Sequence, residues 1–241
     1  GIGSAYAATL HSQQVQRPVN SDSGKDTDTD TEALIKNPLS TSGACGVERW
    51  AVKTGTDANV GLISLQSISQ TTIAALSSLT PPATLPASSR IQPTETTVFQ
   101  LHDTLTEYKL ESDSDYHLIL ADASGKTMIV EIPDPACVGS SSPLLADIQK
   151  ARAEFDARYT PGDTFQTANV PVTVTGIGFF DFLHGQTGVA PNGIELHAVL
   201  DVQFDTGGTP TPAPTGTPTP IPTGTPALTP TGTTSATLAP M

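Results

Sequence analysis

Carboxylate and imidazole side chains are concentrated in two separate parts of this sequence. One part is the run ESDSDYH at residues 111–117, and the other extends from residue 181 to residue 197. Such groups bind divalent metal ions and transfer protons in general acid–base catalysis. The candidate residues are Asp113, Asp115 and His117 in the first part, and Asp181, His184, Gln186, Glu195 and His197 in the second. They form one site only if the fold brings the two parts together.

Glu195 and His197 are separated by one residue in a run that favours a β-strand. Alternate residues of a strand point to the same face, so the pair can share a proton or bind one ion. The candidate catalytic residues are Glu195, His197 and His117. The candidate metal ligands are Asp113, Asp115, His117, Glu195 and His197, for a divalent ion. The alternative is a hydrogen-bonded structural pair at the rim of the fold.

The loop FLHGQTG at residues 182–188 is a second feature that can bind a ligand. Gly185 and Gly188 permit unusual backbone angles and allow a ligand to approach the chain closely. The predicted ligand-binding residues are His184, Gln186, Asp181, Asp113 and Asp115. The alternative for His184 is a hydrogen bond within its own loop.

The elements that must position these residues are mostly β-strands. Residues 96–133 contain three β-favouring runs, the last two joined by an Ala-Ser-Gly turn signal. Two more strands are expected at residues 170–182 and 193–204. Nearer the N-terminus, residues 47–54 alternate well enough for a strand, and residues 59–85 predict a short helix or an irregular cover over the core.

One helix is expected between the third and fourth strands. Ser142 is a suitable N-cap and Pro143 suits the first helical position. An apolar stripe at helical spacing follows, made of Leu144, Ile148, Ala151, Phe155 and Tyr159. The following Pro-Gly pair ends the helix.

The order of these elements predicts an OB-fold-like, five-stranded Greek-key barrel with a helix between strands three and four. An N-terminal strand and helix extend it. Ligands of this fold meet the loops that join strands one and two and strands four and five. Here those loops are residues 111–115 and 183–193, so we expect the two chemically capable parts of the sequence to converge.

Charge and composition limit what the chain can bind. Its net charge is −13, and a strongly acidic protein lacks the basic surface that follows nucleic-acid phosphates. Residues 8–43 and 206–241 contain too little apolar surface to fold, so they predict a polar linker and a Thr/Pro-rich tail. Residues 44–205 form the predicted core, and no apolar run is long enough to cross a membrane.

Export is predicted from two features. Residues 1–7 contain Ala-Tyr-Ala, which fits the end of a signal peptide. Cys45 and Cys137 are the only cysteines, and a lone pair in an exported chain predicts a disulfide.

Three motifs together resemble a family of secreted bacterial proteins with an OB-fold-like core and no assigned activity. They are CGVERWAVKTGTD, YHLILADASGKTMIVEIPDPAC and GIGFFDFLHGQTGVAPNGIELHAVLD, and the resemblance covers about residues 44–204. Members often have Pro where this chain has Ala198. The resemblance implies export and a Cys45–Cys137 pair, but it supplies no catalytic residues.

A more distant likeness, of fold alone, is to staphylococcal-nuclease-like enzymes, which bind calcium beside acidic residues near their first hairpin. Asp113 and Asp115 fall in a comparable place. Those enzymes also use arginines at the phosphate, whereas the arginines of this core are few and two of them lie on the predicted helix.

The sequence therefore predicts a secreted OB-fold-like binding module that uses the loops 111–115 and 183–193. Its ligand is unidentified, with a glycan or a protein as candidates. The alternative is a divalent-metal-dependent hydrolase of the phosphodiesterase or nuclease kind. A second alternative is a structural cell-surface or spacer protein without a small ligand. The chain contains no Walker loop, dinucleotide fingerprint or serine-nucleophile elbow that would favour another class of enzyme.

Overall fold

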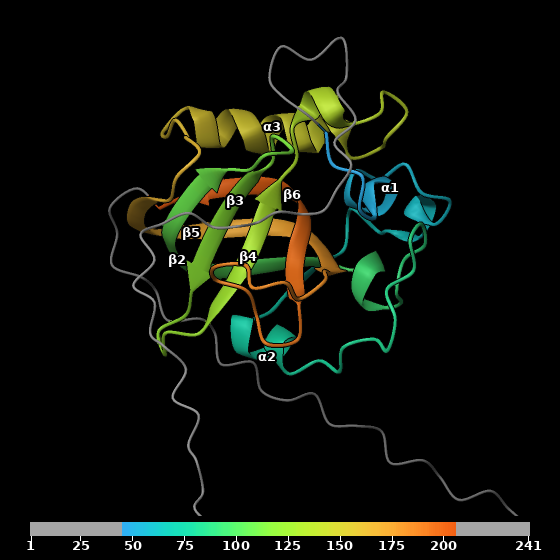
Figure 1. Cartoon of the computed structure of the whole chain (residues 1–241), viewed down its shortest axis with the longest axis horizontal. Coiled ribbons are helices and arrows are strands. Elements are labelled where there is room, and N and C mark those ends of the chain that lie inside the picture. The colour runs from blue at the N-terminus through green and yellow to red at the C-terminus, as the bar shows by residue number, and fades with distance from the viewer. Residues whose placement is uncertain (1–44, 206–241) are drawn as a thin grey trace, which may run out of the picture. The chain divides into compact units, whose positions relative to one another are not determined.

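The structure is a computed structural model that describes residues 45–205 (Figure 1). The predicted signal-peptide remnant (residues 1–7), linker (residues 8–43) and tail (residues 206–241) lie outside the described residues. No helix within residues 45–205 has both the length and the hydropathy needed to cross a bilayer.

The described part of the chain is mainly β. The five core strands and the helix appear in the predicted order, but the sheet has a sixth, short strand, β1, that was not predicted. In chain order the elements are α1 (Trp50–Lys53), a 3-10 turn (Val60–Leu62), β1 (Ile68–Gln70), α2 (Ile73–Ser77), a 3-10 turn (Thr94–Thr96), β2 (Val98–Leu110), β3 (Tyr116–Ala121), β4 (Thr127–Ile132), a 3-10 turn (Pro135–Cys137), α3 (Leu145–Asp156), β5 (Gln166–Phe180) and β6 (Ile194–Phe204).

Six strands form one sheet in the order β1-β2-β3-β4-β6-β5, and a further antiparallel ladder joins β2 to β5. The predicted meander over residues 96–133 is confirmed, because β2–β3 and β3–β4 pair antiparallel. The β1–β2 and β4–β6 ladders are parallel. Figure 1 places α3 across one end of the strands and α2 at the opposite end.

The helix α3 connects two hydrophobic clusters. Ala151 and Phe155 pack in the larger cluster, whereas Leu144 and Ile148 pack in the smaller one. All four side chains are fully buried, so the predicted apolar stripe is confirmed. The helix begins at Leu145, three residues after the predicted N-cap. Ser142 accepts a hydrogen bond from the Leu144 amide and donates one of 2.7 Å to the carbonyl of Thr54, which places it in the turn before the helix.

The predicted strand at residues 47–54 is wrong. This segment is a turn followed by the short helix α1, and Arg49 precedes the helix with a left-handed φ of 48°. The long-range contacts of Arg49 decide the structure of this segment and outweigh the alternation of apolar and polar residues that favours a strand. The guanidinium of Arg49 binds the carboxylate of Glu95 and donates to the carbonyls of Pro86, Ser89 and Phe180.

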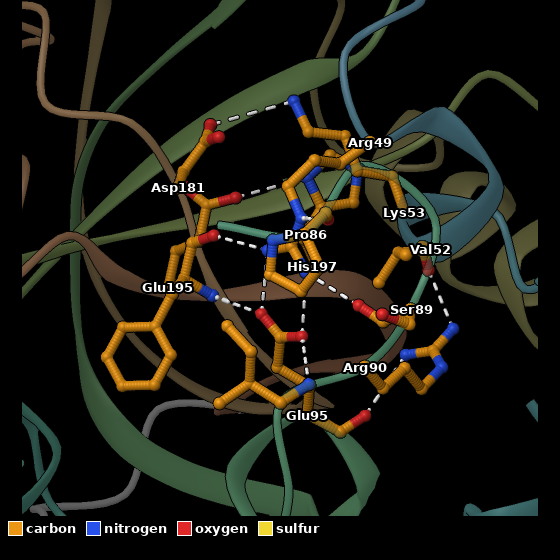
Figure 2. Close-up of polar contacts among 12 residues, drawn as sticks. Arg49, Val52, Lys53, Pro86, Ser89, Arg90, Glu95, Asp181, Glu195 and His197 are labelled. Atoms are coloured by element: carbon orange, nitrogen blue, oxygen red, sulfur yellow. Dashed lines mark hydrogen bonds and ion pairs between the residues drawn. The ribbon is translucent and has the colours of Figure 1, made fainter. Parts of the chain in front are cut away.

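A buried ion pair joins three distant segments of the chain (Figure 2). Arg49 meets Glu95 in a bidentate arrangement at 2.7 and 2.8 Å, and both side chains are at most 1% exposed. Glu95 also accepts from the amides of Ile91 and Phe180. Beside it, Arg90 binds Asp57 at 2.8 Å and donates to the carbonyl of Val52.

The predicted disulfide is confirmed. Cys45 is bonded to Cys137, with 5.5 Å between the Cα atoms and 92 residues between them in sequence. It connects the start of the described chain to the segment after β4. The ion pairs and the disulfide together hold the α1 segment against the sheet.

We expect Glu95→Gln to destabilise the protein by about 3–5 kcal/mol, because removing one partner leaves the Arg49 charge buried without compensation. Urea unfolding of the full chain measures this loss. Asp163→Asn is the matched control, since Asp163 is exposed. Equal free energies of unfolding for the two variants would contradict the role given to the pair.

Candidate functional site

Residues from both predicted loops line one small cavity. Its volume is about 20 Å³, which is room for roughly one water molecule or ion. The lining residues are Lys53, Glu111, Asp113, Ile129, Glu131, Asp181, His184, Gln186 and Glu195. They come from α1, from the β2–β3 loop, from β4, from the segment after β5 and from β6, so five parts of the chain meet here.

His117 lies on β3 with its two ring nitrogens in different environments. Nε2 is 3.0 Å from the carbonyl oxygen of Thr187, and because a carbonyl can only accept, Nε2 carries a hydrogen. Nδ1 is 2.9 Å from Glu111 Oε1 and 3.4 Å from Glu131 Oε1. The ring is fully buried. His117 therefore presents Nδ1 to two carboxylates.

His197 lies on β6 and is also fully buried. Its Nδ1 is 2.9 Å from Glu131 Oε2 and 3.2 Å from Glu195 Oε1. Its Nε2 is 3.3 Å from Asp115 Oδ2. Glu131 thus contacts both imidazoles, one through each of its oxygens.

The acidic loop before β3 is organised by its own carboxylates. Asp113 Oδ1 accepts from the amide of Asp115 at 3.1 Å, which is the geometry of a tight polar turn. Asp115 Oδ1 accepts from the amide of Asp134 at 2.9 Å, and this bond ties the loop to the end of β4. Asp115 therefore has one oxygen in a structural bond and the other facing His197.

Lys53 provides a positive charge among the acidic residues that line the cavity, and Figure 2 shows its ion pair with Asp181. Its Nζ is 3.6 Å from Asp181 Oδ2, and both side chains are at most 9% exposed. The other oxygen, Asp181 Oδ1, is buried and has no hydrogen-bond partner within residues 45–205. Burial would lower the pKa of Lys53, but the carboxylates of Asp181, Glu131 and Glu195 outweigh it and raise that pKa well above the usual value.

Burial and mutual repulsion also change the carboxyl groups. Burial, reinforced by the charges of Glu131 and Asp181, raises the pKa of Glu195 to about 8. Burial and the neighbouring carboxylates of Asp115 and Glu131 raise the pKa of Asp113 well above its usual range. The pKa of Glu131 shifts in the opposite direction, because its ion pairs with the two histidines outweigh its burial and hold that pKa well below normal.

Neighbouring carboxylates raise the pKa of both histidines. Burial disfavours the charged imidazole of His117, but the close carboxylates of Glu111 and Glu131 outweigh burial and raise its pKa to about 10. His197 is likewise raised well above its ordinary value by Asp115, Glu131 and Glu195. Without a metal, protons hold these acids and imidazoles together.

The structure also places the loop residues predicted to bind a ligand. Gln186 is buried and closes its own loop, since its Nε2 donates to the carbonyl of Phe182 at 2.7 Å and its Oε1 accepts from the amide of His184 at 3.2 Å. His184 is exposed. Both line the cavity from outside the imidazole–carboxylate cluster.

Sequence reasoning missed Lys53, Glu111 and Glu131. A signal for Glu131 was present, because a hairpin centred on the Ala-Ser-Gly turn pairs His117 directly with Glu131 across the two strands. Lys53 had no such signal, since its orientation depends on α1 and on the contacts of Arg49.

No family model matches the chain, and no curated protein matches it in sequence. Among solved structures, one that matches is described as a putative aspartyl-tRNA synthetase from Leishmania major Friedlin, with 13% identity and a TM-score of 0.34. The match covers 61% of this chain and 23% of that chain. A similarity at this level carries no inference about function.

We expect the metal-free protein to lose stability as the pH rises from about 6.5 to about 10. Folding raises the pKa of His117 from 6.5 to about 10, so its contribution is complete below pH 6.5 and is lost as the pH approaches 10. Glu195 acts in the same direction, with a contribution complete below pH 4.5 and lost as the pH rises through about 8.

Urea unfolding in EDTA at a series of pH values measures this dependence. His117→Asn should flatten the pH dependence of the free energy of unfolding, whereas His102→Asn, at an exposed position on β2, should leave it as in the wild type. An unchanged slope in His117→Asn would contradict the assignment.

Proposed function

We propose that this protein is an exported, OB-fold-like module that binds a divalent metal ion in the cavity between the loops 111–115 and 183–193. The ladders run from β2 through β3, β4, β6 and β5 and return to β2, which supports the barrel of that fold. The disulfide and the resemblance to secreted bacterial proteins support export.

One observation carries the metal proposal. His117 Nδ1 and Glu111 Oε1 lie 2.9 Å apart and are both buried, yet neither has a hydrogen bond of acceptable geometry within the described residues. An N–H donor that close to its acceptor normally points at it. Two buried atoms that are close but not aligned can serve as two ligands of one ion, although Glu111 Oε1 is also 3.1 Å from Nζ of Lys109.

The spacing of the ligand atoms supports the same conclusion. Two ligands that each lie about 2.1 Å from one ion are about 3.0 Å apart at a right angle and about 3.4 Å apart at a tetrahedral angle. The distances from His117 Nδ1 to Glu111 and Glu131 are 2.9 and 3.4 Å. A mixed imidazole and carboxylate set favours Zn²⁺ or Mn²⁺ over Ca²⁺ and Mg²⁺, which prefer oxygen ligands.

The size of the cavity argues against a larger ligand inside it. A sugar ring or a peptide side chain does not enter a volume of about 20 Å³. A glycan or protein partner would therefore bind the outer surface of the loops, where Phe182 and Leu183 are 40% and 59% exposed. The spacer hypothesis loses its main expectation, which was a surface without a pocket.

A metal-dependent hydrolase is the second candidate. It is favoured by the contacts of His197 with Asp115 and Glu195, and by Glu131, which contacts both His197 and His117. We place it second because the cavity accommodates an ion but no substrate.

The proposal predicts that Zn²⁺ or Mn²⁺ raises the thermal unfolding midpoint of EDTA-treated protein as the concentration passes the dissociation constant. His117→Asn and Glu131→Gln should reduce the shift strongly, because each removes a ligand. His102→Asn, at an exposed position that does not line the cavity, is the control and should respond like the wild type. Absence of a shift with every divalent ion tested would overturn the metal proposal.

A further inference from the structure

We propose that Lys53 and Asp181 condense to form a covalent cross-link, an amide bond between Nζ of the lysine and Cγ of the aspartate. The bond joins α1 to the segment directly after β5. This inference is independent of the proposed metal binding, whose ligands are other residues, namely Glu111, His117 and Glu131.

The two groups that react already face each other (Figure 2). Nζ of Lys53 lies 3.6 Å from Oδ2 of Asp181, and the carbon to be attacked is the atom bonded to that oxygen. A charge-assisted hydrogen bond is shorter, at about 2.7–2.9 Å, so this contact is looser than such a bond. Because the lysine side chain is long and flexible, rotation of its own bonds brings Nζ to the carbon without a change in the backbone.

Both side chains are shielded from solvent. That of Lys53 is 5% exposed and that of Asp181 is 9% exposed, and both line the cavity, which has room for roughly one water molecule. Two charges removed from water lose hydration that their mutual attraction repays only with excellent geometry. Condensation replaces the ammonium and the carboxylate by one neutral amide, so burial favours the product.

The second oxygen of Asp181 supports the same conclusion. Oδ1 is buried and has no hydrogen-bond partner within residues 45–205. Native proteins leave few buried polar atoms unsatisfied, and each one calls for an explanation. In the cross-linked protein the side chain keeps a single oxygen, because the other leaves as water. That oxygen belongs to a neutral amide, whose burial costs less free energy than the burial of a carboxylate.

The backbone on each side of the pair is fixed. Lys53 lies one helical turn after Arg49, which the buried Glu95 holds in place. The amide of Asp181 donates to the carbonyl of Gly193 at 2.8 Å, which ties this segment to the start of β6. Groups held in a reactive geometry behave as if their concentration reached about 10⁵–10⁸ M. Such a concentration favours the amide over the separate acid and amine.

The condensation needs no oxidant, reductant or cofactor. Burial lowers the pKa of the Lys53 amine, but the surrounding carboxylates outweigh burial and raise it, so the starting state is an ammonium beside a carboxylate. The N–Cγ bond forms as one Cγ–O bond breaks. Of the three ammonium hydrogens, two leave with the departing oxygen as water and one stays on the amide nitrogen. Glu131 and Glu195 line the same cavity, and a carboxylate there can carry a proton from the nitrogen to the departing oxygen.

The cross-link and the disulfide connect different parts of the chain. The disulfide joins Cys45 to Cys137, whereas the amide joins α1 to the end of β5. Thiol reductants do not break an amide, so α1 stays covalently attached to the sheet when the disulfide is reduced. Like a disulfide, the bond stabilises the protein by restricting the unfolded chain.

The test is the mass of the intact full chain after reduction of the disulfide. We expect the wild type to be lighter by one water molecule than its sequence requires. Lys53→Arg keeps the positive charge but replaces the amine by a weakly nucleophilic guanidinium, so it should have the full sequence mass. Lys126→Arg, at an exposed position, is the matched control and should keep the deficit. The full sequence mass in the wild type would overturn the cross-link and leave the proposed metal binding standing, because the thermal shift with Zn²⁺ or Mn²⁺ tests that binding separately.

Digestion with trypsin locates the bond, because trypsin does not cleave after a lysine whose amine is acylated. In reduced and unfolded protein, the peptide that contains Lys53 should be recovered joined to the peptide that contains Asp181. Asp181→Ala should release the two peptides separately and abolish the mass deficit. A water loss that persists in Lys53→Arg, or that lies in a peptide without Lys53, would overturn the assignment, and circular dichroism confirms that each variant is folded.

Discussion

A bidentate contact between Arg49 and Glu95 lies where the α1 segment, the approach to β2 and the end of β5 meet. The geometry of the site depends on this contact, because residues close in sequence to Arg49 and to Phe180 lie in the cavity wall or pack against it. Lys53 lies one helical turn after Arg49, so the direction of its ammonium follows from the position of α1. On the other side, Glu95 binds the amide of Phe180, and the neighbouring ring of Phe179 lies between Arg49, at 4.5 Å, and His197, at 5.6 Å. A structural ion pair thereby sets two walls of the cavity.

The second constraint is the cost of removing charge from water. A buried carboxylate must be protonated, paired or bound to a cation. The cluster around Glu131 meets this requirement in the metal-free protein by holding protons on His117, His197 and Glu195. In the metal-bound protein that we propose, cations take the place of those protons.

Much of the fold was predictable because its signals are local. The meander and the apolar stripe of α3 are read from residue spacing, whereas the disulfide is read from a lone pair of cysteines in a chain expected to be exported. The structure confirms all three. The segment at residues 47–54 was not predictable, since its helix depends on contacts that Arg49 makes some 40 to 130 residues away. Glu131 was missed for a different reason: one face of β4 was assigned to the core and the partners of the other face were not traced across the hairpin. The OB-fold assignment remains a prediction.

Trp50 gives the α1 segment a spectroscopic property. It is the only tryptophan of the chain, and its indole Nε1 donates to the carbonyl of Cys137 at 3.3 Å. The ring is thus anchored to the backbone of one half of the disulfide, three residues before Lys53. With excitation selective for tryptophan, the emission of the whole protein consequently comes from this one indole, so a change in its wavelength or intensity reports movement of the α1 segment.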